Sequence, residues 1–305
     1  MDLALTGVDG GQAGVTYPAP AKLNLFLHVV GRRADGFHLL QTVFRFLDVG
    51  DELEINVRDD GQIRLANPLP GVPVEKDLCW RAATLLQTHT GCRLGAEISL
   101  HKILPLGGGL GGGSSDAATV LLALNRLWQL NLPRETLQRL GLQLGADVPV
   151  FVFGRSAFAE GVGEVLTAWS PPPAHYVVLV PPVHVSTPAI FAHPALTRNT
   201  PSVTISALSE GLRNDVLPEI SRSVLRNDLE SVASALYPEV AESISWLGQQ
   251  DECRGLARMT GSGACVFAAF QSREVAQAVF ARRLGHLQGF VAEGIDQHPL
   301  YAWAD

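Results

Sequence analysis

"LPLGGGLGGGSSDAAT", residues Leu104–Thr119, places six glycines within the seven positions 107–113. Glycine loses more backbone entropy on folding than any other residue, so a fold that gathers six of them uses their lack of a Cβ atom. An alternating apolar run, AEISLHKIL, precedes the glycines, and apolar residues at helical spacing follow them. A flexible linker would instead be flanked by polar, low-complexity sequence. The stretch therefore predicts a strand, a glycine loop and the start of a helix, in that order.

The start of the expected helix is suited to binding phosphate. Ser114 or Ser115 can cap it through a side-chain oxygen, and Asp116 would lie in its first turn, near the positive end of the helix dipole. Free backbone N–H groups at such a junction attract phosphate, and glycines let phosphate oxygens approach the chain closely. We therefore interpret this segment as a phosphate-binding loop rather than a linker.

The glycine loop can be compared with two known phosphate-binding motifs. A Walker A loop requires G-x-x-x-x-G-K-[ST], and Gly113 occupies the position of its lysine. The pattern G-x-G-x-x-G is met by Gly107, Gly109 and Gly112, so a dinucleotide-binding Rossmann site stays as an alternative. That site needs a carboxylate about twenty residues downstream, at the end of a second strand, whereas helical sequence continues through this region. The Rossmann interpretation is therefore the minor one.

Composition describes a globular protein of 305 residues, 47% hydrophobic and 17% charged, long enough for two domains. The formal net charge is −7 and no basic run is present, so we expect no nucleic-acid partner. Four cysteines without a C-x-x-C pair predict reduced packing residues of a cytoplasmic protein and no cysteine-bound metal. Residues 1–15 lack the pattern of a signal peptide and are expected to form a flexible tail, and no apolar run suggests a membrane partner. The sequence carries no signal for an oligomeric state.

Strand and helix patterns alternate along the rest of the chain. We expect strands over residues 22–30 and 38–57, the second broken at residues 49–51, and a helix over residues 77–88. The apolar run at residues 146–154 is interpreted as extended sequence. The triple proline at residues 171–173 marks a domain boundary, and Pro238 should divide a long amphipathic helix that begins near Leu229.

Polar residues interrupt the apolar pattern at a few positions. Lys22 and Asn24 lie two residues apart in an expected strand, so their side chains point to the same face. Asp147 precedes an apolar run, and His38 ends the turn sequence DGFH. Taken one at a time, a solvated strand face, a turn aspartate and an ordinary histidine explain them equally well. Taken together, these residues favour a functional site over the separate explanations.

Four segments together resemble the 4-diphosphocytidyl-2-C-methyl-D-erythritol kinases, which belong to the GHMP kinase superfamily. They are PAPAKLNLFLHVVGRRADGFHLLQTVF, LPLGGGLGGGSSDAA, GADVPVFVFG with AFAEGVGE, and MTGSGACVF. The resemblance runs in order from Thr16 to Ala269, and the first and third segments are specific to this kinase. It implies the two-domain α+β GHMP kinase fold, with an ATP-binding domain over residues 16–170 and a C-terminal domain over residues 171–305.

The resemblance implies that the chain uses ATP to phosphorylate the 2-hydroxyl of a cytidine-diphosphate-linked methylerythritol, in the non-mevalonate route to isoprenoid precursors. It makes Asp147 the catalytic base and Lys22 its partner. Phosphoryl transfer needs such a pair, a carboxylate to receive the hydroxyl proton and a cation to offset phosphoryl charge. The resemblance assigns ATP contacts to Lys102, Pro105, Leu106, Gly107, Gly108, Gly109, Leu110, Gly111, Gly112, Gly113, Ser114 and Ser115. Mg²⁺ is expected with ATP, although no residue is recognisable as its ligand.

The cytidine end of the substrate is assigned by the same resemblance to Asn24, Phe37, His38, Thr187 and Phe191, with cytosine stacked between the two phenylalanine rings. Phe37 replaces a tyrosine common in the family, and Asp77 replaces an asparagine expected near adenine. Two alternatives remain: another GHMP kinase, acting on homoserine, mevalonate or a sugar, and a nucleotide-binding module without catalysis. A base-stacking clamp would argue against the first, and the presence of both Lys22 and Asp147 argues against the second.

Overall fold

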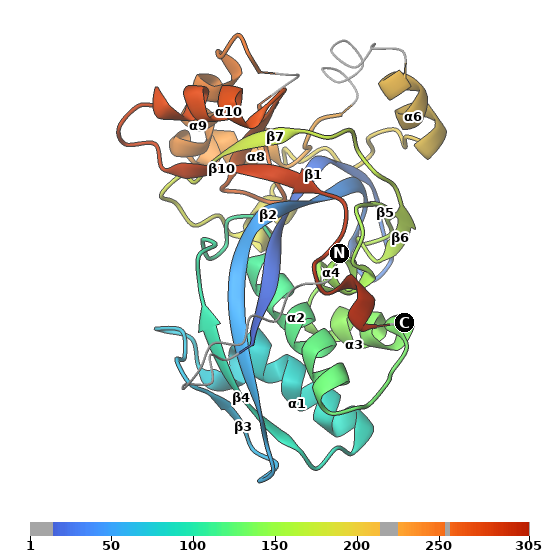
Figure 1. The fold of residues 1–305 in the computed structure, drawn as a ribbon. Coiled ribbons are helices and arrows are strands. Elements are labelled where there is room, and N and C mark those ends of the chain that lie inside the picture. The colour runs from blue at the N-terminus through green and yellow to red at the C-terminus, as the bar shows by residue number, and fades with distance from the viewer. Residues whose placement is uncertain (1–14, 214–224, 254–256, 305) are drawn as a thin grey trace.

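The computed structural model describes residues 15–213, 225–253 and 257–304 (Figure 1). Almost all of the segment expected to be a tail, residues 1–14, lies outside this range. The strands are β1 (Thr16–Arg32), β2 (His38–Arg58), β3 (Ile63–Leu65), β4 (Gly95–His101), β5 (Ala157–Glu160), β6 (Val165–Ala168), β7 (His175–Leu179), β8 (Arg258–Met259), β9 (Val266–Phe270) and β10 (Gly289–Ile295). The helices are α1 (Leu78–Thr90), α2 (Gly112–Leu127), α3 (Arg134–Leu144), α4 (Val148–Phe153), α5 (Thr187–Ala192), α6 (Ile205–Arg213), α8 (Glu230–Leu236), α9 (Pro238–Gly248) and α10 (Arg273–Ala281), with short 3-10 turns η1 (Val74–Lys76) and η2 (Tyr301–Trp303).

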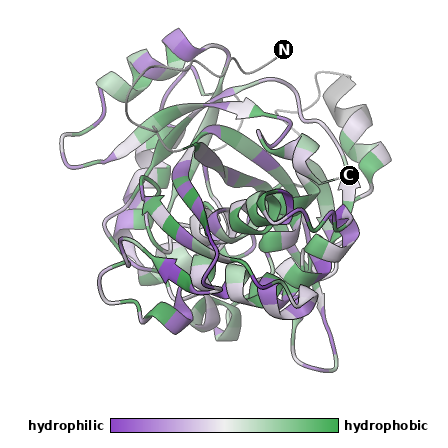
Figure 2. Cartoon of the chain, turned by 60° about the horizontal axis from the view of Figure 1, so that its bottom comes forward, coloured by the Kyte–Doolittle hydropathy of each residue, from purple (hydrophilic) through white to green (hydrophobic). Residues whose placement is uncertain are grey.

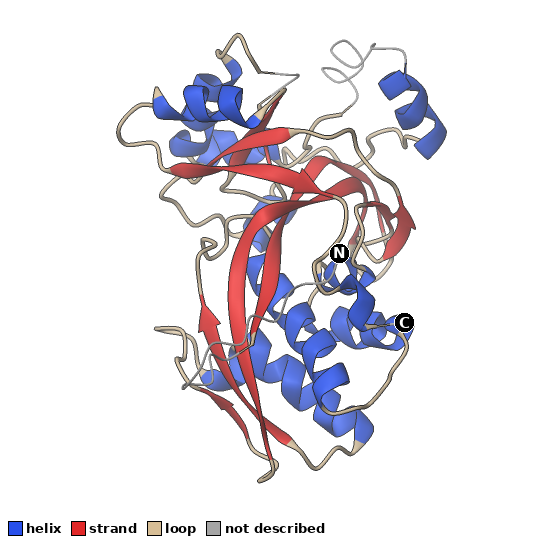
Figure 3. Ribbon diagram, viewed as in Figure 1, coloured by secondary structure: helices blue, strands red, loops and turns tan. Residues whose placement is uncertain are grey.

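The described strands form one ten-stranded sheet (Figure 3). Neighbouring strands follow the order β3-β4-β2-β10-β7-β9-β8, while β1 and β5 also pair with β2, and β6 pairs with β5. Strand β3 is parallel to β4, and the other pairs are antiparallel. The long strand β2 thus pairs with β1, β4 and β5 on one side of the order and, through β10, connects them to β7, β9 and β8. A largely antiparallel sheet with separate groups of helices confirms the α+β class.

Strand β2 runs unbroken from His38 to Arg58, so the break expected at residues 49–51 is wrong. Gly50 lies opposite Pro20 of β1, where the pairing shifts register between Pro20 and Lys22. A Cβ atom at Gly50 would lie 2.3 Å from the carbonyl oxygen of Ala19. The glycine therefore lets two strands approach closely at a bulge, and the strand continues through it.

Residues 148–153 form the helix α4, so the extended conformation expected for residues 146–154 is wrong there. Five consecutive residues of α4, Val148–Val152, are buried. A short apolar run that is buried on all sides has no periodicity, so its sequence cannot distinguish a helix from a strand. Pro149 is compatible with the helix because the N–H groups of a first turn have no intrahelical partner.

Two expectations about helices are confirmed. The helix expected over residues 77–88 is α1, and the carboxylate of Asp77 caps it by accepting hydrogen bonds from the N–H groups of Cys79 (2.8 Å) and Trp80 (3.3 Å). Pro238 separates α8 from α9, as expected of a residue that cannot continue a helix. All four cysteines are free thiols. Within the described chain, no helix has the length and apolar character needed to cross a membrane.

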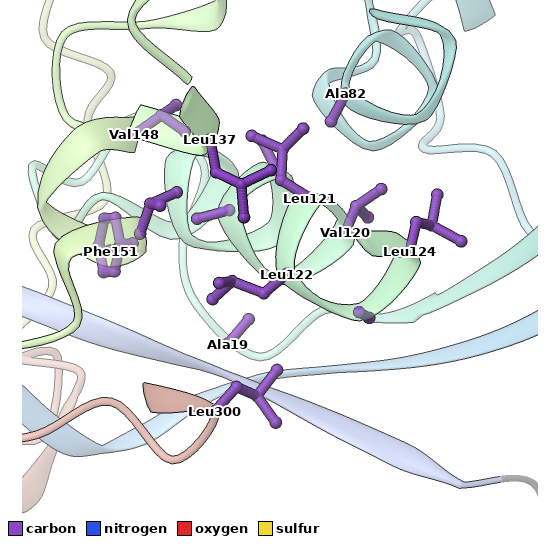
Figure 4. Close-up of a cluster of buried hydrophobic side chains, with 14 of the residues drawn as sticks. Ala19, Ala82, Val120, Leu121, Leu122, Leu124, Leu137, Val148, Phe151 and Leu300 are labelled. Atoms are coloured by element: carbon purple, nitrogen blue, oxygen red, sulfur yellow. The ribbon is translucent and has the colours of Figure 1, made fainter. Parts of the chain in front are cut away.

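The first hydrophobic core lies between helices α1–α4 and strands β1, β2 and β4 (Figure 4). Helix α2 is central to it, since twelve of its sixteen residues are buried. Leu300 joins this core from the far end of the chain (Figure 4). Arg134 holds the same terminal segment by donating hydrogen bonds to the carbonyl oxygens of Tyr301 and Ala304.

The second core lies between strands β7–β9 and helices α5 and α8–α10. Figure 2 shows that apolar residues are concentrated in the elements at the centre of the molecule. The first core packs on β1, β2 and β4 and the second on β7–β9, so the two lie on different parts of the sheet.

Candidate active site

The glycine loop connects β4 to α2, which confirms the expected order of strand, loop and helix. Gly107, Gly109 and Gly111 have φ angles of 70°, 77° and 73°, in the left-handed region that favours glycine. Helix α2 begins at Gly112, and no side chain caps it, so the expected serine cap is wrong. Ser115 instead donates a hydrogen bond of 2.7 Å to the carbonyl oxygen of Pro20, which fixes the first turn of α2 to β1.

A turn from the second half of the chain packs against the glycine loop. The N–H of Cys265 donates to the carbonyl oxygen of Gly108 (3.1 Å), and the Thr260 hydroxyl donates to the carbonyl oxygen of Gly109 (3.4 Å). A Cβ atom at Gly109 would lie 2.2 Å from the carbonyl oxygen of Thr260. The Thr260 hydroxyl also accepts a hydrogen bond from the backbone N–H of Asn24 (2.9 Å). The loop, this turn and β1 therefore form one connected surface.

Lys22, Asn24 and Asp147 meet at this surface. The Lys22 ammonium donates to Asn24 Oδ1 (2.6 Å), and its Nζ lies 3.1 Å from Asp147 Oδ2. The Lys22 side chain is only 2% exposed, whereas that of Asp147 is 36% exposed. The backbone N–H of Lys22 donates to the carbonyl oxygen of Leu110, so the cation is held beside the glycine loop. The arrangement presents a reachable carboxylate backed by a buried positive charge.

A cavity of about 280 Å³ opens over this group. It is lined from both halves of the chain by Lys22, Asn24, Gly109, Ser114, Asp147, Thr187, Phe191, Gly261 and Ser262, with Leu27, Leu40, Thr42, Phe44, Ala146, Val162, Gly163 and Leu229. A larger cavity of about 470 Å³ lies beside α8 and α9 and contains none of the site residues predicted from the sequence. The smaller cavity is therefore the candidate active site.

Lys102 lies at the other side of the loop, between two buried carboxylates. Its Nζ is 2.6 Å from Asp51 Oδ2 and 2.7 Å from Asp116 Oδ2. Burial acts to lower the pKa of Lys102, but the two carboxylates outweigh it and raise that pKa. Burial raises the pKa of Asp116 to about 7, and the nearby Asp51 adds to this shift while Lys102 opposes it. The Lys102 ammonium thus pairs with two buried aspartates, and Asp116 is the one that ionises near neutral pH.

We expect the free energy of unfolding to fall as the pH rises from about 4 to about 7. The pKa of Asp116 is about 7 in the folded protein, well above that of an unfolded aspartate. The folded protein therefore binds more protons in this window, and roughly 2–4 kcal/mol of stability present below it is lost as the pH passes 7. Urea titrations at several pH values would measure the slope. Asp116→Asn should flatten it, and an unchanged slope in that variant would contradict the assignment.

The residues predicted to bind the cytidine end lie in two groups. Thr187 and Phe191, on α5, line the cavity, and the Thr187 hydroxyl is hydrogen-bonded to that of Ser262 (2.5 Å). His38 stacks on Phe191, with ring centroids 4.9 Å apart and planes inclined by 28°. Phe37 is 64% exposed and has no ring contact with Phe191 among the described residues. The His38 imidazole therefore stacks on the Phe191 ring, which the sequence predicts to stack on cytosine.

Sequence reasoning missed several residues that support these groups. Asp51 and Thr260 act across long sequence separations, to Lys102 and to Asn24. Arg198 donates to His38 across 160 residues (3.2 Å). The TGSG sequence at residues 260–263 was visible as a glycine turn, but nothing in it indicated which segment it would contact.

Comparison with known proteins identifies the fold and the family. Residues 77–155 match the GHMP kinases N terminal domain, and residues 207–284 match the GHMP kinases C terminal domain. The chain is 34% identical to a solved 4-(cytidine 5'-diphospho)-2C-methyl-D-erythritol kinase, with a TM-score of 0.75 over 92% of this chain and 99% of that one. A homoserine kinase from Cytophaga hutchinsonii shares the fold, with a TM-score of 0.68 over 96% of this chain and 98% of that one, at 19% identity.

Curated relatives give the same result. A 4-diphosphocytidyl-2-C-methyl-D-erythritol kinase of Thiobacillus denitrificans is 58% identical over 93% of this chain and 97% of its own length. One of Nitrosospira multiformis is 54% identical over 99% of this chain and 98% of its own length. These relationships favour this kinase over the homoserine, mevalonate and sugar kinases of the same superfamily. The chain has the two-domain GHMP kinase fold and belongs to the 4-diphosphocytidyl-2-C-methyl-D-erythritol kinase family.

Proposed function

We propose that the chain transfers the γ-phosphoryl group of ATP to the 2-hydroxyl of 4-diphosphocytidyl-2-C-methyl-D-erythritol, and that Asp147 and Lys22 carry the reaction. The observation that supports this most directly is the pair itself, a partly exposed carboxylate 3.1 Å from a buried ammonium, in a cavity that also includes Gly109 of the glycine loop. Phosphoryl transfer asks the protein mainly for positioning and charge stabilisation, and this pair supplies both.

Asp147 is proposed to receive the proton of the substrate hydroxyl. As the hydroxyl oxygen forms its bond to the γ-phosphorus, the bond from that phosphorus to the β,γ-bridging oxygen breaks, and the proton moves to the carboxylate. Lys22 holds the carboxylate in place and offsets negative charge on the transferred group. Asn24 fixes the ammonium by accepting from it (2.6 Å), and Asn24 in turn donates to the Thr42 hydroxyl (3.0 Å). The cation is thus positioned before substrate binds.

ATP is proposed to lie with its phosphates over residues 105–115, at the N-terminus of α2. The glycine loop brings backbone close to the ligand, and the helix dipole favours negative charge at this point. Lys102 is the nearby cation, and Asp51 anchors it while also accepting from the N–H groups of Ile103 (2.6 Å) and Leu104 (2.7 Å). This carboxylate therefore positions both the lysine and the backbone that leads into the loop.

Mg²⁺ is proposed to enter with ATP and to neutralise phosphate charge. Among the described residues, no group of three or more His, Cys, Asp or Glu side chains could hold a metal ion. Mg²⁺ usually keeps several waters and is bound through substrate phosphates with one or two protein oxygens, so a preformed cage is not required. Ser114 lines the cavity, and its hydroxyl is the oxygen donor proposed to reach the ion, while the Asp147 carboxylate keeps its role as the base.

Both proposed domains would contribute residues to the site. Residues 16–170 carry the glycine loop and Asp147, and residues 171–305 carry Thr187 and Phe191. The partner is a small molecule, and the net charge of −7 supports the absence of a nucleic-acid partner. Free thiols at all four cysteines support a reducing compartment, the cytoplasm.

Phe37→Ala and Phe191→Ala are each expected to raise the dissociation constant for the cytidyl substrate by about five- to 150-fold, because base stacking on an aromatic ring contributes roughly 1–3 kcal/mol. The exposed ring of Phe37 should leave the melting temperature unchanged, whereas Phe191 also packs on the second core and should lower it slightly. Calorimetric titration and thermal melts would be run beside Leu284→Ala, a truncation of another exposed apolar side chain. Normal substrate binding in both phenylalanine variants would contradict the stacking role.

The activity is tested by supplying ATP with the cytidyl substrate and, in parallel, with homoserine, mevalonate and galactose. We expect phosphate transfer only to the first. Comparable transfer to any of the other alcohols would overturn the proposed substrate, and ATP binding without ATP consumption in any of these assays would point to a nucleotide-binding module without catalysis.

A further inference from the structure

Arg198 connects the predicted cytidine-binding residues to one another. It lies in the loop after α5 and donates to the carbonyl oxygens of Phe191 (2.9 Å), His193 (2.9 Å) and Leu196 (3.0 Å). Its N–H on Nε donates to His38 Nε2 (3.2 Å), at the start of β2. A single guanidinium therefore ties the end of α5 to the histidine that stacks on it.

This contact determines which nitrogen of His38 carries a proton. A guanidinium has five N–H donors, no acceptor, and stays protonated in proteins, so His38 Nε2 must be the acceptor. In the neutral imidazole the proton then lies on Nδ1. The edge of the ring that faces away from Arg198 is therefore a hydrogen-bond donor.

The charges around His38 keep the ring neutral. Burial lowers the pKa of His38, and the positive charges of Arg198 and Arg32 lower it further. Arg198 comes from the loop after α5, and Arg32 ends the neighbouring strand β1. Phe191, on which the ring stacks, has no charge. Near neutral pH the donor character of Nδ1 thus reflects a fixed tautomer and not a doubly protonated ring.

We propose that Arg198 is a positioning residue for cytosine recognition, which acts by holding His38 in its Nδ1–H tautomer and in its stack with Phe191. This inference rests on the proposed function, in which His38 and Phe191 contact the cytidine end of the substrate. The N3 atom of cytosine is an acceptor, whereas N3 of uracil carries a hydrogen. The Nδ1–H of His38 can donate a hydrogen bond to N3 of cytosine, whereas it would face the N3–H donor of uracil. Fixing this tautomer therefore contributes to specificity for cytosine.

Arg198→Met tests the role through kinetics. KM for the cytidyl substrate should rise about tenfold, the effect of losing one oriented hydrogen bond, with little change in kcat or in KM for ATP. Selectivity for the cytidyl substrate over its uridine analogue should fall in this variant. Without Arg198, the His38 imidazole can carry its proton on Nε2, and its Nδ1 can then accept a hydrogen bond from the N3–H of uracil. Lowering the pH from 8 to 6 should reduce the defect, since imidazolium always carries a proton on Nδ1.

Two further variants separate this role from a structural one. Arg198→Lys keeps the positive charge but replaces the planar fork by a single ammonium, and it should recover only part of the selectivity. Arg282→Met makes the same chemical change at an exposed arginine on α10's C-terminal side, whose partners are Gln250 and Glu252. It should match the unaltered enzyme in every assay. Thermal melts would confirm that each variant is folded.

The tautomer itself is measured by ¹⁵N NMR of the labelled full chain, with the His38 signals assigned by their loss in His38→Gln. We expect an Nδ1–H signature in the unaltered protein and a shift toward Nε2–H in Arg198→Met. An unchanged tautomer in that variant, or unchanged selectivity with no acid recovery, would overturn the role of Arg198. Equal use of cytidyl and uridyl substrates by the unaltered enzyme would instead overturn the proposed cytosine recognition, and NMR would still decide how Arg198 acts on His38.

Discussion

Replacing Asp147 by asparagine is expected to lower turnover by about 100-fold or more, as found when a general base is removed. The amide has nearly the shape of the carboxylate but cannot take the proton of the substrate hydroxyl. Stability should change little, because Asp147 is 36% exposed and its side chain makes no capping hydrogen bond to α4. Lys22 keeps its hydrogen bond to Asn24, so the buried ammonium retains a polar partner. ATP affinity should also stay near normal.

Steady-state kinetics, ATP calorimetry and thermal melts would be measured together for this variant. Asp60→Asn is a matched control, since Asp60 is a surface carboxylate paired with Arg58 and lies outside the cavity. Near-normal turnover in Asp147→Asn would remove the residue from the proposed role. A fall in turnover accompanied by an equal loss of folded protein would assign it a structural one.

Gly109→Ala is expected to lower the free energy of unfolding by about 3 kcal/mol or more, through two backbone effects. Gly109 has a φ of 77°, which a residue with a Cβ atom rarely adopts, and that atom would lie 2.2 Å from the carbonyl oxygen of Thr260. The backbone fixes the position of a Cβ atom, and the atom that it meets is a backbone oxygen, so no side-chain rotation relieves the contact. ATP affinity should fall as well, because the loop must move.

The sequence alone suggests that a larger residue at Gly109 would weaken ATP binding and spare the cytidyl substrate. The structure changes this expectation, because Thr260 contacts both Gly109 and the backbone N–H of Asn24. We therefore expect both ligands to bind more weakly, measured by calorimetry on the folded fraction. Gly285→Ala is the control, since nothing lies within 4 Å of its added Cβ atom. A Gly109→Ala protein that melts like the control would contradict the close contact with Thr260.

The parts of the fold that could be predicted are those in which local sequence has a single interpretation. The start of α1 near Asp77 and the division of α8 from α9 at Pro238 are such cases, because the chemistry of these residues acts on their neighbours in sequence. The break expected in β2 and the extended run expected at α4 were wrong for a common reason. Gly50 and the apolar residues of α4 are compatible with more than one structure, and tertiary packing decides between them.

The same distinction between local sequence signals and long-range contacts applies to the candidate site. Lys22 and Asn24 were placed on one face by the two-residue period of a strand, and their side chains do meet. Arg198, Asp51 and Thr260 carry no local signal, because each acts on a residue that is distant in sequence. The sequence predicts a cap on α2 by Ser114 or Ser115, but no side chain caps that helix, and the Ser115 hydroxyl donates to a carbonyl group of β1.

The return of the terminal segment to the first core has a consequence for the order of folding. Leu300 and Ala304 complete a core whose other buried members end at Ala159. During synthesis, the first half of the chain therefore emerges before the residues that close its core have been made. Contacts of such high sequence separation slow folding and leave apolar surface uncovered in the meantime. The two halves should thus reach the native state together, and the nascent first half should depend on chaperones longer than a self-contained domain of its size.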